Sequence, residues 1–537
     1  MLLRDSNIAR LQAEEFDVAI IGGGINGAVS AAALSARGVK VALIDRGDFA
    51  SETSQESSNL AWGGIKYLES FEFGLVRKLC NSRNHLMRQY PSTVQEIRFL
   101  TTHAKGFRQP RWMLYLGTWI YWLMGKGFTE KPRWLSLNQM RKEVPILAEN
   151  RFDGGIEYSD AYLHDNDARF VFNFVRSALN YGCIATNYVE SLGAEFNNNQ
   201  WSIEAVDRIS GKGFNIRAGV LLNTCGPYVD AHNRLTQQQT EHRHVFSKGI
   251  HLIVDRIIPL PKVLTFFAND GRMFFAIPMG PKTCIGTTDT RVDSAKAQVD
   301  AEDRRFVLDN INERLKLDTP LTEADIIAER CGVRPLVVRG NVDEEIDWVQ
   351  LSRKHVIEVD KDKAHMSVFG GKLTDCLNVG EEICTYYTRE FGRRVAYPNK
   401  RWYGEPVDTI RDEYLHQAEL MKLDAMTSPD SSEMLTSRLW RRYGAQALGI
   451  LEKIREDPKM AEVMIEGTEY LRAEISLAAH REMIIKLEDF LRRRSKIALI
   501  ASTEKIKQSE GIMEACRVLF GDDAKAKFDE YFDQRRG

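Results

Sequence analysis

One stretch, residues 16–45, limits most strongly what this chain can fold into. It reads FDVAIIGGGINGAVSAAALSARGVKVALID. The apolar run 18–21 is typical of a strand buried on both faces, and it leads directly into three glycines at G-x-G-x-x-G spacing. The small residues 28–34 predict a helix that packs closely on a sheet, and the apolar run 39–44 predicts a second strand ending at Asp45.

This order of elements favours a dinucleotide site over a plain structural turn. Gly22 permits the turn, Gly24 lets the backbone approach a pyrophosphate, and Gly27 lets the helix pack on the strand. The N-terminus of the helix offers N–H groups to the phosphates. Asp45 is placed to accept hydrogen bonds from a ribose hydroxyl. The motif alone does not distinguish NAD from FAD.

Length and composition limit the remaining possibilities. A chain of 537 residues exceeds what one core usually supports, which predicts two or three domains. A net charge of -2, from 73 basic and 75 acidic residues, argues against a nucleic-acid-binding protein.

The eight cysteines form no CxxC pair, so no zinc site or iron–sulfur cluster is predicted. The N-terminus has no apolar core of a signal peptide, which predicts a chain that starts in the cytosol.

Several further blocks occur in an order that resembles the FAD-dependent glycerol-3-phosphate dehydrogenases and oxidases of the D-amino-acid-oxidase superfamily. The first is IIGGGINGA, followed by TSxxSSxLxxGGIKYLE. The others are FDGGIEYSDAYLHDNDARFV (152–171), LLNTCGPYVD (221–230), IPMGPKTCIGTTDT (277–290), CGVRPL (331–336) and VFGGKLTD (368–375). The resemblance spans nearly the whole chain.

The resemblance implies an α/β fold with three parts. A Rossmann-like FAD-binding domain of the glutathione-reductase type is expected from 1–85, 155–235 and 330–400. A substrate domain, which reads as largely β, is expected from 86–154 and 236–329. A composition rich in charged helices after residue 405 predicts an α-helical C-terminal domain over 405–537.

The resemblance also implies FAD as the cofactor. A polar loop at 51–73 follows the acid that ends the second strand, and it is expected to line the cofactor unless it is an ordinary surface loop. The cofactor-binding residues carried over are Gly22, Gly24, Asn26, Gly27, Asp45, Thr53, Ser54, Ser58, Gly63, Gly64, Gly226, Gly370, Gly371, Lys372, Leu373 and Thr374.

The activity implied is oxidation of glycerol 3-phosphate to dihydroxyacetone phosphate, with a quinone as electron acceptor. Residues that would hold the phosphate and polarise the hydroxyl are Lys66, Tyr67, Arg334 and Lys372, with a hydrogen bond from Thr287 or Thr288. Arginine stays protonated and is therefore excluded as the base. His251 is the candidate base and a neutral lysine is its rival. A core role for His251 and a structural ion pair for Arg334 remain open.

The chain departs from the family pattern at five positions. Asn59 stands where lysine is usual, Trp62 where histidine is usual and Lys66 where arginine is usual, while Cys376 and Leu377 replace tyrosine and arginine. These changes leave two alternatives open. One is a flavin oxidase that uses oxygen on a related hydroxy acid, phosphorylated polyol or amine. The other is a non-catalytic flavin-binding protein.

An aromatic-rich apolar run, 112–124, lies between basic residues at Arg108, Arg111 and Lys126. It is shorter than the ~20 residues needed to cross a bilayer. Its composition suits a helix at a membrane interface, although a core helix would look similar. The resemblance implies a homodimer that is attached peripherally to the inner membrane from the cytoplasmic side.

Three polar patterns have ordinary structural interpretations. Asn166 and Asp167 are placed to cap a helix that follows them. The pair His242 and His244 has no acid or cysteine at a spacing that supports a metal site. The run Arg492–Arg494 is predicted to form a solvated face, with no nucleic-acid or catalytic role.

Overall fold

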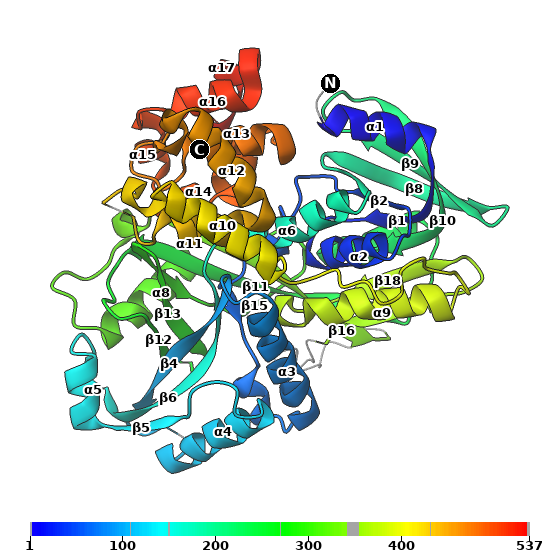
Figure 1. The fold of residues 1–537 in the computed structure, drawn as a ribbon. Coiled ribbons are helices and arrows are strands. Elements are labelled where there is room, and N and C mark those ends of the chain that lie inside the picture. The colour runs from blue at the N-terminus through cyan, green and yellow to red at the C-terminus, as the bar shows by residue number, and fades with distance from the viewer. Residues whose placement is uncertain are drawn as a thin grey trace.

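The computed structural model describes residues 3–107, 109–148, 151–268, 270–340, 354–429 and 431–533. The chain forms two large sheets and a separate group of helices near its C-terminus (Figure 1). This architecture confirms the predicted α/β fold, with a Rossmann-like domain, a β-rich part and an α-helical C-terminal part.

The first sheet has a parallel centre, in which β1 pairs with β10 on one side and with β2 on the other. The predicted strand 18–21 is the end of β1, and β2 begins at Val41 rather than at residue 39. In sheet order the strands are β17 (Val356–Asp360), β18 (His365–Phe369), β10 (Gly213–Asn223), β1 (Glu15–Ile21), β2 (Val41–Ile44) and β7 (Ile184–Thr186), and β9 (Gln200–Asp207) joins β8 (Val189–Asn197) to β10.

Small residues let three helices pack tightly beside this sheet. Ala28, Ala31 and Ala32 of α2 (Ile25–Ala36) are fully buried. They belong to the same apolar core as residues of α6 (Asp167–Asn180) and α9 (Cys376–Arg389). Asn166 caps α6, because its side chain accepts a hydrogen bond from the backbone N–H of Ala168 at 3.2 Å, as predicted.

The second sheet is mainly antiparallel, and its two halves come from distant parts of the chain. Its order is β15 (Thr290–Val292), β11 (His242–Asp255), β14 (Lys282–Gly286), β13 (Met273–Met279), β12 (Lys262–Phe267), β4 (Val94–Ala104), β6 (Phe152–Leu163) and β3 (Leu60–Ala61), with β16 (Ala328–Arg339) on β11 and β5 (Arg133–Ser136) on β6. The chain therefore passes from the first sheet to the second and back, and β11 and β16 carry residues of the predicted substrate site.

The other helices of the N-terminal three quarters surround these sheets. They are α1 (Leu3–Ala13), α3 (Phe73–Gln89), α4 (Arg111–Met124), α5 (Leu137–Glu143), α7 (Val229–Leu235) and α8 (Ala301–Arg314). The apolar run 112–124 thus forms helix α4, and Arg108 lies outside the described residues. No helix among the described residues is long and apolar enough to cross a membrane.

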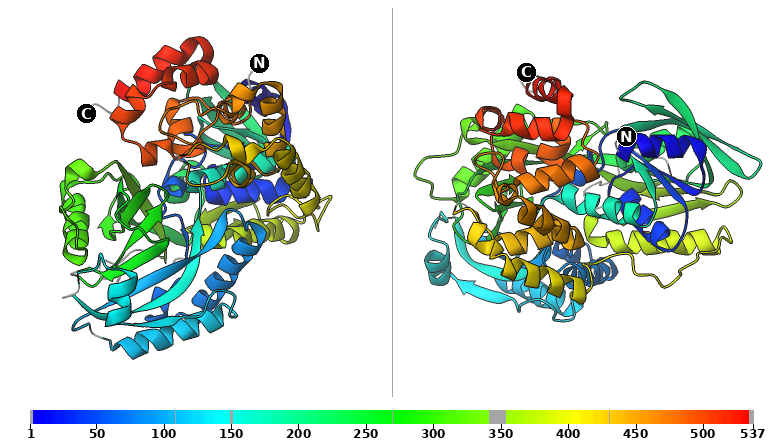
Figure 2. Two further views of the ribbon diagram at one scale, coloured as in Figure 1. Left: turned by 60° about the vertical axis from the view of Figure 1, so that its left-hand side comes forward. Right: turned by 45° about the horizontal axis from the view of Figure 1, so that its top comes forward.

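The C-terminal helices stack together on one side of the molecule, shown from yellow through orange to red in Figure 2. Two apolar cores hold them together. They are α10 (Asp408–Leu420), α11 (Leu435–Tyr443), α12 (Ala447–Glu456), α13 (Arg472–Arg481), α14 (Ile497–Ile500), α15 (Thr503–Gln508), α16 (Ile512–Phe520) and α17 (Ala524–Asp533), with the short helical turn η10 (Asp489–Arg494) before α14.

The prediction of a solvated face for Arg492–Arg494 is wrong. The three residues are only 6, 3 and 2% exposed. Asp48 pairs with Arg493 and Arg494, and Glu56 pairs with Arg492. These acids lie more than 430 residues away in the sequence, so local charge patterning gave no sign of them.

Candidate active site

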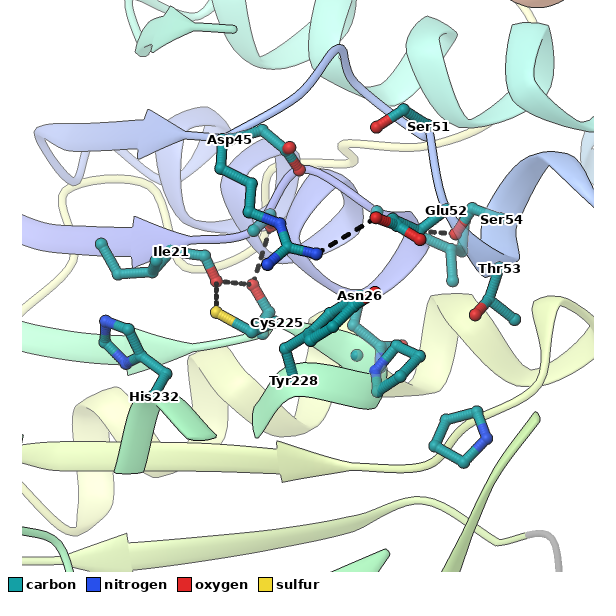
Figure 3. Close-up of a pocket in the computed structure, with 18 of the residues that line it drawn as sticks. Ile21, Asn26, Asp45, Ser51, Glu52, Thr53, Ser54, Cys225, Tyr228 and His232 are labelled. Atoms are coloured by element: carbon teal, nitrogen blue, oxygen red, sulfur yellow. Dashed lines mark hydrogen bonds and ion pairs between the residues drawn. The ribbon is translucent and has the colours of Figure 1, made fainter. Parts of the chain in front are cut away.

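A cavity lies at the carboxyl ends of β1, β2 and β10 (Figure 3). This is the edge at which open α/β sheets bind their ligands. About 1120 Å³ of space lies between its walls, counted out to the open solvent. Its walls are Ile21, Gly22, Gly24–Asn26, Asp45, Arg46, Ala50–Ser54, Val189–Ser191, Thr224–Tyr228, Ala231, His232, Leu235, Pro335, Gly370 and Gly371.

The three glycines of the motif have different reasons to lack a side chain. A Cβ at Gly22, whose φ is 104°, would lie 2.6 Å from the carbonyl oxygen of Thr224. At Gly27 it would lie 1.9 Å from the carbonyl oxygen of Gly22. A Cβ at Gly24 would meet only Ser54 Oγ, at 3.2 Å. Packing therefore requires Gly22 and Gly27, whereas Gly24 leaves room at the cavity, as close approach of a pyrophosphate demands.

The carboxylate of Asp45 stands at the cavity where a ribose hydroxyl is expected. Its oxygens accept hydrogen bonds from the backbone N–H groups of Gly23 (2.6 Å) and Gly47 (2.8 Å). Burial raises its pKa to about 6, although these two hydrogen bonds oppose the rise. The backbone thus fixes the orientation of the carboxylate, and each oxygen keeps lone pairs for a further donor.

The start of α2 faces the same cavity. Gly24 is its N-cap, and the N–H of Ile25 donates to Ser54 Oγ at 3.0 Å. The first N–H groups of a helix and its dipole attract phosphate. Asn26 lines the cavity and donates from Nδ2 to the carbonyl oxygen of Gly370 at 3.0 Å. The helix start, the space at Gly24 and the acid at 45 together fit a dinucleotide.

The turn Gly370–Gly371 forms another wall, and both glycines have positive φ, 62° and 112°. The N–H of Gly370 donates to Nε2 of His244 at 3.1 Å. The proton of this ring must then lie on Nδ1, which is 2.9 Å from Oδ2 of Asp230. His242 is held by Glu358 at 2.6 Å. The His-x-His pair is thus engaged by carboxylates that are distant in the sequence.

The polar loop after Asp45 lines the cavity through Thr53 and Ser54. Thr53 Oγ1 also donates to the carbonyl oxygen of Val333 on β16 at 2.8 Å. Gly226 lies on the wall and has φ 54°. The other predicted cofactor residues do not line this cavity; they are Gly27, Ser58, Gly63, Gly64, Lys372, Leu373 and Thr374.

A group of aromatic and cationic side chains lies beyond the Gly370–Gly371 turn. Lys372 Nζ donates to Tyr67 Oη at 2.8 Å and lies 4.2 Å from the centroid of that ring. It lies 6.0 Å from the ring of Trp62. Thr374 Oγ1 donates to the carbonyl oxygen of Trp62 at 3.3 Å. The structure thus brings together Lys372 and Tyr67 of the predicted substrate residues.

A second group of predicted substrate residues meets where β16, which carries Arg334, passes the segment between β14 and β15, which carries Thr287 and Thr288. Arg334 donates from Nη2 to Thr287 Oγ1 at 2.8 Å and from Nη1 to the carbonyl oxygen of Thr288 at 3.3 Å. Its Nη1 lies 3.4 Å from Oδ1 of Asp289, so the guanidinium also has a structural partner. The turn that precedes Lys372 lies beside the strand of Arg334, because a Cβ at Gly370 would lie 3.6 Å from the carbonyl oxygen of Pro335.

His251 lies in the same sheet, next to the second group. It is 2% exposed, and neither ring nitrogen has a hydrogen-bond partner among the described residues. Burial, and then the charges of Arg330 and Arg334, lower its pKa to about 3. The imidazole is therefore neutral at ordinary pH and has a lone pair for a proton. A histidine satisfied within the core would have partners, so the geometry favours a ligand contact.

Lys66 is placed differently from the other predicted substrate residues. It belongs to the helical turn η2 (Ile65–Leu68) and lines an apolar cleft between this turn, helix α4 and strands β6 and β12. Tyr67, the next residue, reaches Lys372 instead. The turn η2 therefore separates the apolar cleft from the cationic group.

Sequence analysis did not identify Arg330, which is fully buried beside the predicted site. It stands opposite His251 in the pairing of β11 with β16. Its Nη1 donates to Asn59 Oδ1 at 2.8 Å and to the carbonyl oxygen of Ser57, while Nε and Nη2 have no partner among the described residues. A cation from β16 thus reaches Asn59, where the family usually has lysine. Only the folded structure shows that Arg330 lies beside Asn59, because the two residues are far apart in the sequence.

Two family models match the chain. One, described as FAD dependent oxidoreductase, matches residues 17–356, and the other, described as the C-terminal domain of alpha-glycerophosphate oxidase, matches residues 411–527. A glycerol-3-phosphate dehydrogenase of Pseudomonas aeruginosa is 30% identical, over 91% of this chain and 93% of that protein. An aerobic glycerol-3-phosphate dehydrogenase of Staphylococcus aureus strain USA300 is 29% identical, over 90% of this chain and 87% of that protein.

Solved structures show the same fold. The glycerol-3-phosphate dehydrogenase from Bacillus halodurans complexed with FAD matches with a TM-score of 0.74 at 22% identity, over 99% of this chain and 97% of that chain. An L-alpha-glycerophosphate oxidase from Mycoplasma pneumoniae with FAD bound matches with a TM-score of 0.55 at 16% identity, over 73% of this chain and all of that one.

Proposed function

Because the chain belongs to the FAD-dependent glycerol-3-phosphate dehydrogenase family, we propose that it oxidises glycerol 3-phosphate to dihydroxyacetone phosphate and passes the electrons to a quinone. The cofactor is FAD, and the cavity at β1 has the shape, the acid and the helix start that this dinucleotide requires. One observation carries the proposal: Lys372 follows the turn Gly370–Gly371, the strand of Arg334 lies beside that turn, and the charge of Arg334 acts on a neutral His251.

Arg334 and Lys372 are the reason for proposing a phosphorylated substrate. Arg334 presents a planar fork of donors that suits a phosphate, whereas Lys372 is a compact charge. Arg334 is anchored by Thr287 and Asp289, and Lys372 by Tyr67. These anchors limit the freedom of both side chains, so less conformational entropy is lost when an anion binds.

Oxidation of a secondary alcohol also requires a proton acceptor. When bound, FAD supplies the acceptor for the hydrogen of the carbinol carbon. His251 takes the hydroxyl proton on a ring nitrogen, and burial, together with the charges of Arg330 and Arg334, keeps the ring neutral beforehand. A neutral lysine remains the rival base. Tyr67 and Thr287 orient the cations and do not exchange the proton.

Peripheral attachment to a membrane is supported by the outer face of α4. Trp112, Leu116 and Leu123 are 62, 50 and 64% exposed, which is unusual for apolar side chains gathered on one helix. Phe71 and Phe73, which line the apolar cleft beside α4, add two more exposed rings. An amphipathic helix with tryptophan and a basic flank at Arg111 suits the headgroup region of a bilayer.

The apolar cleft supports a quinone as the electron acceptor. It is lined by Met113, Leu116 and Ile120 of α4 and by Ile65 and Leu68 of η2, so it opens beside the exposed face of the helix. On the other side of η2, Tyr67 touches Lys372. A lipid-soluble ring in this cleft would lie between the membrane face and the cationic group.

Turnover of glycerol 3-phosphate with a short-chain quinone tests this proposal. We expect dihydroxyacetone phosphate and reduced quinone in equal amounts, with glycerol inactive as the unphosphorylated control. Release of hydrogen peroxide in air at the same rate, with no reduction of the quinone, would show an oxidase instead. The absence of product with either acceptor would overturn the proposed substrate.

A further inference from the structure

The loop that follows Asp45, residues 46–56, is here called the cofactor loop. It supplies Arg46 and Ala50–Ser54 to the wall of the FAD cavity. Both of its ends are held from the C-terminal helical region, by the arginines of η10. No described residue beyond Gly371 lines the cavity itself, so η10 reaches FAD only through this loop.

The first end of the cofactor loop is anchored at Asp48, which is 1% exposed. Its Oδ2 accepts hydrogen bonds from Arg493 Nε (2.7 Å) and Arg494 Nη1 (2.8 Å), and its Oδ1 accepts one from Arg494 Nη2 (2.8 Å). Burial would raise the pKa of Asp48, but Arg494 and Arg493 hold it below the ordinary value. The carboxylate is thus charged and accepts three hydrogen bonds from the C-terminal region, besides one from Asn187 Nδ2 at 2.8 Å.

The second end is anchored at Gln55 and Glu56, directly after the cavity residues Thr53 and Ser54. Arg492 Nη2 donates to the carbonyl oxygen of Gln55 at 2.5 Å and lies 3.2 Å from Glu56 Oε1. The other carboxylate oxygen of Glu56 accepts the N–H of Cys331 on β16 at 3.2 Å. This end therefore joins the C-terminal region to the strand that carries Arg334.

The arginines are themselves held rigidly. Arg493 Nη2 donates to Asp489 Oδ1 at 2.6 Å, and Tyr188 Oη donates to the same oxygen at 2.7 Å. Arg494 Nη2 also donates to the carbonyl oxygen of Glu482 at 3.1 Å. Buried ion pairs hold only one relative geometry, and loss of one partner leaves an uncompensated buried charge. Undocking of η10 would therefore remove the charged partners of Asp48 and Glu56 and leave the cofactor loop with its other hydrogen bonds, such as those from Asn187 to Asp48 and from Thr53 to Val333.

We propose that Arg492, Arg493 and Arg494 are positioning residues of the FAD site, and that FAD binding is coupled to docking of the C-terminal helical region. A docked η10 holds the cofactor loop in the shape that binds FAD. By reciprocity, bound FAD favours the docked state of η10. The inference rests on FAD as the cofactor and is independent of the substrate and the electron acceptor.

Hydrogen exchange of the full-length protein, with and without FAD, tests the coupling directly. We expect FAD to slow exchange at least fivefold in residues 485–500 as well as in the cofactor loop, although residues 485–500 do not line the cavity. Protection confined to residues that line the cavity would overturn the coupling. This measurement needs no variant and no substrate.

The affinity of the apoprotein for FAD tests the role of the arginines. Arg492→Met should raise the Kd for FAD at least tenfold, measured by flavin fluorescence well below the unfolding temperature, and Arg492→Lys should recover part of the loss. The matched control is Arg438→Met, because Arg438 is also a buried arginine, bonded to Ser431 within the C-terminal region. It should lower thermal stability and leave the Kd unchanged. Equal effects of Arg492→Met and Arg438→Met on the Kd would overturn the proposal.

Discussion

At the scale of single residues, Arg334 depends on the absence of a side chain beside it. A Cβ at Gly249 would lie 2.1 Å from Arg334 Nη2 and 2.4 Å from its Cζ. Gly249 thus leaves a shallow trough over β11, in which the guanidinium lies and reaches Thr287. The position of the cation is set by this glycine as well as by hydrogen bonds.

Replacement of Arg334 by alanine should lower kcat/KM for glycerol 3-phosphate by well over tenfold. The reason is that loss of a charged hydrogen-bond donor to an anion corresponds to roughly 1.5–3 kcal/mol. Steady-state kinetics of Arg334→Ala measure this loss. Arg339→Ala is the control, because Arg339 lies on the same strand but is exposed and pairs only with Glu241 among the described residues. Unchanged kinetics in Arg334→Ala would remove this residue from the site.

The Gly249→Ala variant tests the trough itself. The added methyl group would displace the guanidinium, because its nearest contacts are atoms of Arg334 rather than backbone. We expect kcat/KM to fall about tenfold, which is about 1.4 kcal/mol, while the Kd for FAD stays the same. Full activity in Gly249→Ala would show that the position of Arg334 is not critical.

Residues whose role depends on local sequence could be predicted, and those whose role depends on distant pairing could not. Gly27 and Asp45 contact the turn Gly22–Gly23 within one strand–helix–strand unit, so the spacing along the sequence is enough to predict that they lie together. Arg330 is different, because its partner Asn59 is 271 residues away. Nothing next to it in the sequence marks a buried cation.

At the scale of elements, a buried histidine joins three of them near the cofactor turn. His355, just before β17, lies 3.2 Å from Asp375 Oδ2 and 2.9 Å from Glu382 Oε2 of α9. Lys78 of α3 lies 3.2 Å from the same Asp375 oxygen. Burial would lower the pKa of His355, but the hydrogen bonds to Asp375 and Glu382 raise it to about 9.

This raised pKa makes stability depend on pH in a defined direction. The folded state holds the proton of His355 more tightly than the unfolded state, whose pKa is about 6.5. The protonated His355 therefore contributes fully to the free energy of unfolding below about pH 6.5. This contribution, on the order of 3 kcal/mol, is lost as the pH rises through 9. Urea unfolding of the holoenzyme at pH 6 and pH 9.5 should show this loss, and His355→Gln should lack it. An equal loss in both proteins would contradict the assignment.

Helix α4 makes the membrane proposal testable at a single exposed position. Leu123→Glu should weaken binding to vesicles of anionic phospholipid about tenfold or more, because an apolar contact worth roughly 1.5–3 kcal/mol is lost and a negative charge is added. Leu420→Glu is the control, because Leu420 is equally exposed (67% against 64%) but ends α10 in the C-terminal region. Co-sedimentation that falls equally in both variants would exclude α4 as the membrane face.

At the scale of the whole molecule, the cofactor site is assembled from every part of the chain. The first sheet supplies the cavity, β16 carries Arg334, the turn after β18 leads to Lys372, η2 supplies Tyr67, and the C-terminal arginines hold the cofactor loop. The kind of fold followed from motifs, because strand, turn and helix leave a local pattern. The docking of the C-terminal region could not be predicted from motifs. In the sequence alone, Arg492–Arg494 look like a solvated run of charge, and only the structure shows the buried acids that pair with them.

We propose that this flavoprotein oxidises glycerol 3-phosphate at a site that includes His251, Arg334 and Lys372. The most direct test is to add glycerol 3-phosphate to the purified holoenzyme without oxygen and to record the visible absorption of the flavin. We predict that the band of the oxidised flavin disappears, with one equivalent of substrate consumed per flavin. A band that persists with glycerol 3-phosphate, yet is bleached by a chemical reductant, would contradict this account.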